Sequence, residues 1–184
     1  MQDYASARAM FSRVLEQSED REEILEAMSG TAAIFRKEKD YGKALEAYRA
    51  IWSEYPEPEI RQETGYYAAR MLDNLNRYQE ALEAYSAVEA PRPERMDADI
   101  SLRKSDCLYE MGEYEEALLG YLKTAYLYPA MEKTALTALE SASELLEMLG
   151  REKEAVRIYK KIIELDPDGI KGEMASQKLM EAKQ

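Results

Sequence analysis

The sequence of 184 residues has no histidine and a single cysteine, Cys107. Without histidine, the chain has no imidazole metal ligand and no catalytic triad that uses a histidine base. One cysteine cannot form an intrachain disulfide or a zinc site of several thiolates, so cysteine pairing gives no information on the redox compartment. These absences exclude a large share of enzyme chemistry.

Long apolar runs and an excess of positive charge are also missing. No stretch of about 18 apolar residues predicts a membrane span, and the amino-terminal segment is amphipathic, unlike a signal or transit peptide. The sequence holds 25 lysines and arginines against 37 aspartates and glutamates, which gives a net charge of −12. Such a surface repels phosphate backbones and anionic lipid heads, so we expect no nucleic-acid binding and no membrane insertion. The compartment stays open, with the bacterial periplasm and the cytoplasm both allowed.

Catalytic and metal-binding motifs are absent as well. The sequence has no glycine-rich phosphate loop, no serine or cysteine beside a histidine and no His-Glu metal motif. Its carboxylates are dispersed, often four residues from a lysine or arginine, as on ordinary solvated helices. The segment Asp166-Pro167-Asp168-Gly169 lacks the ligand spacing of a calcium loop, and we interpret it as a turn with a helix cap. We therefore predict a protein without enzymatic activity, cofactor or metal.

The sequence does contain an internal repeat. The pattern Tyr-x-x-Ala-x-x-x-aromatic occurs four times, and a fifth copy has Glu152 in place of the first tyrosine. The alanines of the five copies are 36 to 38 residues apart, at Ala7, Ala44, Ala81, Ala117 and Ala155. A proline follows twelve residues after the alanine in copies two to five, at Pro56, Pro93, Pro129 and Pro167. Because proline cannot donate the next backbone hydrogen bond, it marks the end of a helix.

A second amphipathic segment of helical period lies between each proline and the next Tyr-x-x-Ala, so each unit is predicted to be a helical hairpin. The turns between paired helices are predicted at Lys39-Asp40, Asn76-Arg77, Gly112-Glu113 and Gly150-Arg151. Asp20-x-x-Glu23 resembles a capping box, and Pro58 suits a first helical turn. The alanine lets two helices approach closely, and the aromatic residue one turn later fills the space between hairpins.

These positions make the sequence resemble the tetratricopeptide repeat family, whose pattern includes Gly-x-x-Tyr, Ala-x-x-x-Phe and a terminal proline. The repeat spacing is similar to that of bacterial envelope members, such as the Tol-Pal-associated periplasmic protein and the outer-membrane-assembly lipoprotein. The resemblance implies an all-α fold, a right-handed α-solenoid of stacked antiparallel helical hairpins. We divide the single array, residues 1–184, into a half repeat at 3–17, repeats at 22–56, 58–93, 96–129 and 130–167, and a C-terminal capping helix at 168–183.

The resemblance also implies that the first helix of each hairpin lines a concave groove that receives a peptide or a partner helix. Spacings of three and four residues place one stripe of each first helix on a single face, and the stripes become more acidic toward the C-terminal repeats. In the first helix of repeat 22–56 this stripe consists of Glu26, Ser29, Ala33, Arg36 and Lys37. Tyr66 and Tyr109 have the mixed apolar and polar character of protein-binding anchors. The candidate partner-binding residues are Arg36, Tyr66, Arg70, Asn74, Asp106, Tyr109, Glu110, Glu140, Glu144 and Glu147.

The sequence therefore predicts a protein-interaction module whose partner segment is basic where it meets the last two repeats. Two alternatives stay open. One is a self-associating scaffold or spacer within a larger, envelope protein, with a homodimer formed through the N-terminal half repeat; the other is the regulatory appendage of an enzyme. We predict Cys107 in the core, and we predict that Trp52 packs against the next hairpin rather than stacking on a ligand.

Overall fold

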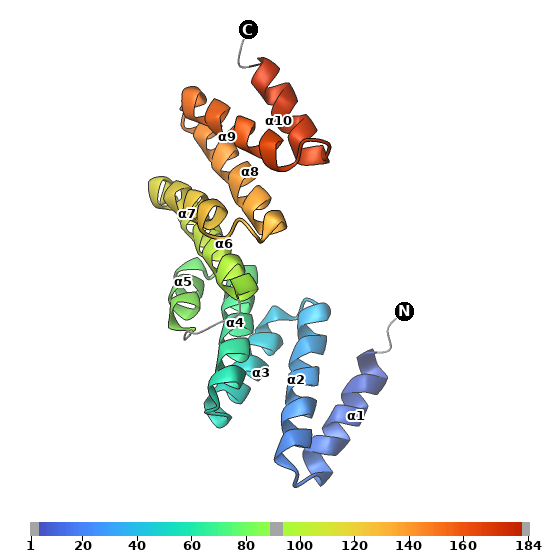
Figure 1. Cartoon of the computed structure of the whole chain (residues 1–184). Helices are drawn as coiled ribbons and strands as arrows, with labels where there is room; N and C mark the ends of the chain where they lie inside the picture. The colour runs from blue at the N-terminus through green and yellow to red at the C-terminus, as the bar shows by residue number, and fades with distance from the viewer. Residues whose placement is uncertain (1–3, 89–93, 182–184) are drawn as a thin grey trace. The chain divides into compact units, whose positions relative to one another are not determined.

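A computed structural model describes residues 4–88 and 94–181, and these residues form ten α-helices (Figure 1). The helices are α1 (Tyr4–Gln17), α2 (Arg21–Lys37), α3 (Tyr41–Glu54), α4 (Pro58–Asn74), α5 (Tyr78–Ala87), α6 (Glu94–Glu110), α7 (Tyr114–Leu127), α8 (Glu132–Met148), α9 (Glu152–Leu165) and α10 (Ile170–Glu181). The chain divides into two compact units, Met1–Pro91 with α1 to α5 and Arg92–Gln184 with α6 to α10. Within the described residues, no helix is both long and apolar enough to cross a membrane.

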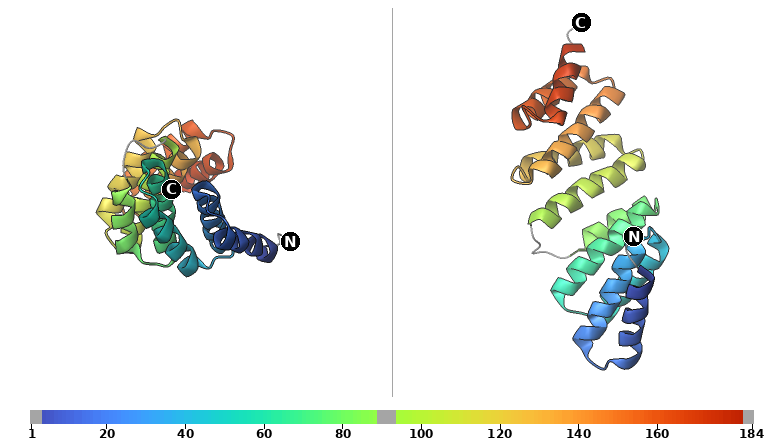
Figure 2. Two further views of the ribbon diagram at one scale, coloured as in Figure 1. Left: turned by 90° about the horizontal axis from the view of Figure 1, so that it is seen from below. Right: turned by 90° about the vertical axis from the view of Figure 1, so that its right-hand side faces the viewer.

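Each unit is built from helical hairpins, as the repeat predicts. The hairpins are α2–α3 and α4–α5 in the N-terminal unit, and α6–α7 and α8–α9 in the C-terminal unit. Consecutive helices run antiparallel in both units (Figure 2). Every first helix has 17 residues, whereas the second helices have 14 residues except for α5, which has 10. The all-α class and the hairpin architecture are therefore confirmed.

The turn inside each hairpin has the same backbone conformation in all four repeats. One residue per turn takes a left-handed φ, with values of 62° at Lys39, 58° at Asn76, 82° at Gly112 and 69° at Gly150. In the first hairpin the Lys39 amide donates to the Arg36 carbonyl at 3.2 Å, and the Asp40 amide donates to the Phe35 carbonyl at 2.9 Å. This pair of bonds ends the first helix and satisfies its last carbonyls. The predicted turn positions are confirmed.

The repeated alanines and tyrosines form the core. Ala44, Ala81 and Ala117 have no exposed surface, and Ala155 is 1% exposed. The tyrosines one turn later, at 48, 85, 121 and 159, are all buried. Cys107 is fully buried, which confirms its prediction as a core residue. Because the alanine has a small side chain, the two helices of a hairpin approach closely at that level.

Helix starts follow the sequence signals with one difference. The Asp20 carboxylate accepts hydrogen bonds from the amides of Glu22 and Glu23, and α4 begins at Pro58. The Glu23 carboxylate, however, accepts from the hydroxyl of Ser18 at 2.6 Å, and the amide of Asp20 donates to that same hydroxyl at 3.0 Å. In a capping box the Glu23 side chain would accept directly from the Asp20 amide, whereas here the Ser18 hydroxyl bridges these two groups. Pro93, a predicted helix end, lies outside the described residues.

The last helix packs on α9 and begins at the Asp-Pro-Asp-Gly turn. The Asp166 carboxylate accepts hydrogen bonds from the amides of Lys171 and Gly172, at 3.1 and 3.3 Å. This contact confirms the interpretation of the turn as a helix cap. Gly172 is buried, and a Cβ atom at this position would overlap the backbone carbonyl of Asp166. The close approach of α10 to the end of α9 therefore requires glycine.

Candidate interaction surfaces

The N-terminal unit contains a cavity of about 390 Å³ beside α2, which we call the α2 cavity. Four of its lining residues come from the predicted stripe of the first helix, at Glu26, Ser29, Ala33 and Arg36. The remaining wall comes from Phe11, Leu25, Gly30, Tyr48, Ile60, Glu63, Thr64 and Tyr67. The side of α2 that the repeat pattern predicts as groove-lining is therefore hollowed in this unit.

Arg36 and two tyrosines contact one another in the wall of this cavity. The Arg36 guanidinium lies 4.8 Å from the ring centroid of Tyr67, and its Nε donates to the Tyr48 hydroxyl at 3.3 Å. The rings of Tyr48 and Tyr67 are stacked, with centroids 5.2 Å apart and planes at 20°. Burial raises the pKa of the Tyr48 hydroxyl, although the Arg36 hydrogen bond opposes this shift. Arginine held over a tyrosine face is well suited to contact both apolar and polar groups.

The predicted residues of α4 interact with one another. The Tyr66 ring lies 5.2 Å from the ring of Tyr67, and the Arg70 guanidinium lies 5.7 Å from the Tyr66 centroid. The side-chain amide nitrogen Nδ2 of Asn74 donates to the Arg70 backbone carbonyl at 2.7 Å. Tyr66 is not among the residues that line the α2 cavity, whereas its neighbour Tyr67 is. The aromatic residue that α4 contributes to this cavity is therefore Tyr67, one position after the predicted Tyr66.

The predicted residues of α6 belong to the C-terminal unit. The Asp106 carboxylate accepts a hydrogen bond of 2.9 Å from the Tyr121 hydroxyl. Burial, followed by the charge of Asp106, raises the pKa of Tyr121. Tyr109 is 37% exposed, with its ring 5.7 Å from that of Tyr114, and Glu110 is exposed. Asp106 thus has a structural role toward a core tyrosine, while Tyr109 and Glu110 lie at the surface.

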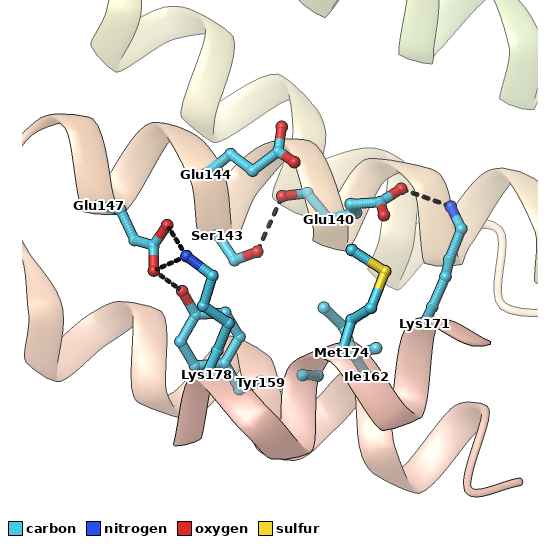
Figure 3. Close-up of a pocket in the computed structure, with 10 residues that line it drawn as sticks. Glu140, Ser143, Glu144, Glu147, Tyr159, Ile162, Lys171, Met174 and Lys178 are labelled. Atoms are coloured by element: carbon cyan, nitrogen blue, oxygen red, sulfur yellow. Dashed lines mark hydrogen bonds and ion pairs between the residues drawn. The ribbon is translucent and has the colours of Figure 1, made fainter. Parts of the chain in front are cut away.

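The acidic stripe of α8 faces lysines of α10 (Figure 3). Lys171 Nζ lies 2.6 Å from a Glu140 carboxylate oxygen, and Lys178 Nζ lies 3.1 Å from Glu147. The Tyr159 hydroxyl also donates to Glu147. Burial alone would raise the pKa of Glu147, but the hydrogen bonds from Tyr159 and Lys178 outweigh it and lower that pKa. Glu144 is exposed, like Glu147, but its carboxylate points away from both lysines (Figure 3).

A small cavity of about 160 Å³ lies between α8 and α10, and Met174 and Ile162 line its apolar side. Two of the three predicted acidic residues of α8 are therefore engaged by the chain itself. Sequence reasoning missed Lys171 and Lys178 as their partners, although a spacing of seven residues places both lysines on one side of a helix. It missed Tyr67 because two adjacent tyrosines compete for one stripe.

In residues 4–88 and 94–181, no group of three or more cysteine, aspartate or glutamate side chains is placed to hold a metal ion. The described surfaces therefore offer aromatic, arginine and carboxylate contacts. These groups are typical of protein recognition.

The sequence matches a tetratricopeptide repeat model over residues 1–57 and 66–132, and another over residues 136–168. No curated protein matches it significantly. Among solved structures, YrrB, described as a TPR protein with an unusual peptide-binding site, is 17% identical with a TM-score of 0.68, over 95% of this chain and 84% of YrrB. BtubC from P. vanneervenii is 15% identical with a TM-score of 0.72, over 99% of this chain and 84% of BtubC.

A Rap protein, solved in complex with the competence and sporulation factor, is 19% identical with a TM-score of 0.64, over 89% of this chain and 49% of the Rap chain. At these identities, the structural neighbours establish the fold. The repeat models cover most of the sequence, and the alanine and aromatic positions of the repeat are buried in each hairpin. The chain therefore belongs to the tetratricopeptide repeat family.

Proposed function

We propose that this chain is a non-catalytic interaction module that binds a peptide or helix of a partner protein along its first helices. The observation that carries the proposal is the α2 cavity, which is lined by the predicted stripe of α2. Its volume of about 390 Å³ lies within the range of small ligand pockets, roughly 300 to 1,000 Å³. The family supports this assignment, because YrrB and the Rap protein are described with a peptide-binding site and a bound factor.

The lining of the α2 cavity indicates what the partner segment carries. Tyr67 and Phe11 offer apolar ring surface, and Arg36 is held by aromatic rings rather than by a carboxylate in this cavity. Two exposed carboxylates, Glu26 and Glu63, also line it. A segment with one large apolar side chain and a nearby lysine or arginine fits this combination, since the ring is buried while the cation meets a carboxylate.

The acidic surface that we propose in the C-terminal unit involves fewer residues than the acidic residues predicted from the sequence. Glu140 and Glu147 are held by Lys171 and Lys178 in the C-terminal unit. Glu110 and Glu144 are exposed, so we assign the recognition of a basic partner segment mainly to these two carboxylates. Charge at such positions changes the rate of encounter more than the affinity of the final complex.

Peptide selection tests this proposal. Random dodecapeptides displayed on phage are selected on the wild-type protein, and the affinity of the best synthetic peptide is measured by fluorescence anisotropy. Ala33→Gln fills the α2 cavity without a change of charge, and we expect binding to weaken about tenfold or more, which corresponds to about 1.4 kcal/mol. Ala50→Gln is the matched control, because Ala50 is exposed on α3 outside the cavity.

Glu144→Lys tests the electrostatic part in a separate experiment with a basic peptide, because Glu144 belongs to the C-terminal unit and the α2 cavity to the N-terminal unit. We expect weaker binding for a basic peptide, with the loss largest at low salt because surface charges are screened as ionic strength rises. Peptides that bind Ala33→Gln and Glu144→Lys as tightly as the wild type would contradict the proposal.

Self-association is a second candidate function, and one observation favours it. Met10 on α1 is 68% exposed, whereas Ile158, at the same position of the repeat in α9, is 7% exposed. Leu15 is 42% exposed, and its equivalent in α7, Ala125, is 6% exposed. Exposed apolar side chains at positions that are buried in α9 and in α7, respectively, mark a surface for a further helix, and we propose a second copy of the chain as its source. The envelope subfamily and the role as an enzyme appendage stay predictions.

Light scattering over a range of protein concentrations checks this candidate. We expect a dimer whose fraction rises with concentration in the wild type and falls in a Met10→Glu, Leu15→Glu variant. An exposed apolar residue elsewhere provides the control, since Leu119→Glu changes a side chain that is 69% exposed on α7. A monomer at all concentrations would leave peptide binding as the function to pursue.

A further inference from the structure

A second pocket of about 360 Å³ opens in the N-terminal unit between α3, α4 and α5, and we call it the Trp52 pocket. It is lined by Arg49, Trp52, Gly65, Ala68, Ala84, Ala87 and Val88. It shares no lining residue with the α2 cavity. Trp52 contacts the next hairpin as predicted, because Arg61 of α4 stacks on its ring, yet 43% of the side chain is exposed.

The repeat itself shows that this pocket is an opened piece of core. The first residues of α4 and α8, Pro58 and Glu132, are 74 residues apart, so Gly65 corresponds to Leu139 and Ala84 to Ile158. In the C-terminal unit Leu139 is 1% exposed and Ile158 is 7% exposed, and both belong to one continuous core cluster. The space that Leu139 and Ile158 fill in the C-terminal unit is bordered in the N-terminal unit by glycine and alanine, with the Trp52 indole in place of the small Ala125 of α7, and a pocket remains beside it.

The backbone of Gly65 does not require glycine. A Cβ atom built there would lie 3.6 Å from Trp52 Nε1 and 3.6 Å from Val88 Cγ2, which is ordinary van der Waals contact. The absence of a Cβ atom at Gly65 therefore leaves room in the pocket, and the backbone conformation of the helix does not require it. Apolar surface that is open to water beside an exposed tryptophan favours a ligand that covers it, since burial removes this surface from water.

The charge around the pocket indicates the kind of ligand. Arg49 is the one charged residue in the described lining, in a chain of net charge −12. Its guanidinium lies 3.9 Å from Glu80, but Glu80 is held more closely by Arg77, at 2.6 Å. Arg61 lies 4.2 Å from the Trp52 ring centroid and donates its Nε to the Trp52 carbonyl. Two arginines thus flank the tryptophan, one on the pocket lining and one on the ring of Trp52.

We infer that the Trp52 pocket binds a large apolar side chain of an acidic partner peptide, with an aspartate or glutamate next to that side chain. The ring or aliphatic chain enters the space between Gly65 and Ala84, and the carboxylate meets Arg49. Tryptophan and arginine are the residue types that contribute most to protein interfaces. The partner chemistry is opposite in charge to that proposed for the α2 cavity, so the two sites recognise different segments.

Trp52 is the single tryptophan of the chain, so its fluorescence reports binding directly. The probe is a blocked hexapeptide, acetyl-Gly-Ser-Phe-Asp-Glu-Gly-amide, and the controls replace its phenylalanine with alanine or its two acids with lysines. We expect a saturable change in Trp52 emission with the first peptide and at least tenfold weaker binding of each control. No saturable change up to millimolar peptide would overturn the inference.

Two variants of the protein sharpen the test. Gly65→Leu places in this pocket the side chain that fills the C-terminal unit, so we expect an intact fold by circular dichroism and at least tenfold weaker binding. Arg49→Glu is expected to weaken binding of the acidic peptide. Arg157→Glu makes an equal charge change at an exposed position of α9 and is expected to leave binding unchanged. Equal affinity for the wild type and Gly65→Leu rules out the pocket as the site. Ala33→Gln is expected to leave this peptide unaffected, which separates the inference from the α2 cavity.

Discussion

The two units share one repeat pattern but differ at one space between their helices. Around Leu139 and Ile158 the C-terminal unit has a continuous apolar core, whereas the corresponding Gly65 and Ala84 leave a pocket of about 360 Å³ in the N-terminal unit. The alanines, the core tyrosines and the left-handed turns are the same in both. The repeat thus determines the backbone, while the size of a few side chains determines whether a space between helices is core or binding surface.

Opening the C-terminal core is expected to give the largest effect. Leu139→Ala removes a side chain that is 1% exposed, and we expect a loss of about 3 kcal/mol in the free energy of unfolding. Urea denaturation followed by circular dichroism measures this loss. The control, Leu119→Ala, truncates a side chain that is 69% exposed on α7 and should cost less than about 0.5 kcal/mol. Equal losses in the two variants would contradict the tight packing of the C-terminal core around Leu139.

Glycine substitutions in the two units are expected to give the next largest difference in stability. In Gly172→Ala the new Cβ overlaps the Asp166 carbonyl, so we expect α10 to shift at a cost of about 2 kcal/mol. Hydrogen exchange read by mass spectrometry should then show faster exchange in α10. The control in the N-terminal unit is Gly42→Ala, where the Cβ would lie 3.9 Å from the nearest atom, and it should stabilise α3 by about 0.5 to 1 kcal/mol. Unchanged exchange in Gly172→Ala would contradict the close approach.

The left-handed turns offer a smaller contrast, because the N-terminal unit uses Lys39 and Asn76 where the C-terminal unit uses glycines. Gly112→Ala has open space around its Cβ, so its expected cost of about 1 kcal/mol comes only from the backbone conformation. Lys39→Gly should stabilise the N-terminal unit by less than about 1 kcal/mol. Thermal unfolding of both variants checks the opposite signs, and two shifts in the same direction would refute this account.

The pH dependence of α10 is the smallest expected effect, since exposed ion pairs contribute roughly 0 to 1 kcal/mol. The pKa of Glu147 is lowered from its ordinary value of 4.5, so its stabilising contribution is present above pH 4.5 and is lost as the pH falls through the lowered pKa. The methyl resonance of Met174, which lies beside this site, should shift with a midpoint below 4.5. In Glu147→Gln that transition should disappear, and its persistence would assign it to another carboxyl group.

The hairpins and their turns could be predicted from the sequence, because they depend on local features repeated four or five times. An alanine at a helix crossing, a proline at a helix end and a left-handed residue at a turn each act within a few residues of the chain. The same logic identified the α2 stripe, where Ala33 and Arg36 line a cavity. It also predicted that Cys107 is buried.

The sites could be predicted only in part, because they depend on contacts between separate helices. Glu140 and Glu147 are paired with lysines 31 residues further along the chain, a pairing that the stripe of α8 alone cannot reveal. The Trp52 pocket arises from side chains that are missing at Gly65 and Ala84. Missing atoms give no signal in a single repeat, and they become visible only when equivalent positions of two repeats are compared in space.

The lysine pairs of α10 also have a consequence for selectivity. Four residues connect α9 to α10, so this tether holds Lys171 and Lys178 near α8 at an effective concentration on the order of millimolar. A free cationic peptide competes with that tethered helix for Glu140 and Glu147, and its apparent dissociation constant is the intrinsic one divided by the fraction of molecules in which both lysines are undocked. Weak, non-specific polycations are therefore disfavoured at Glu140 and Glu147 in particular.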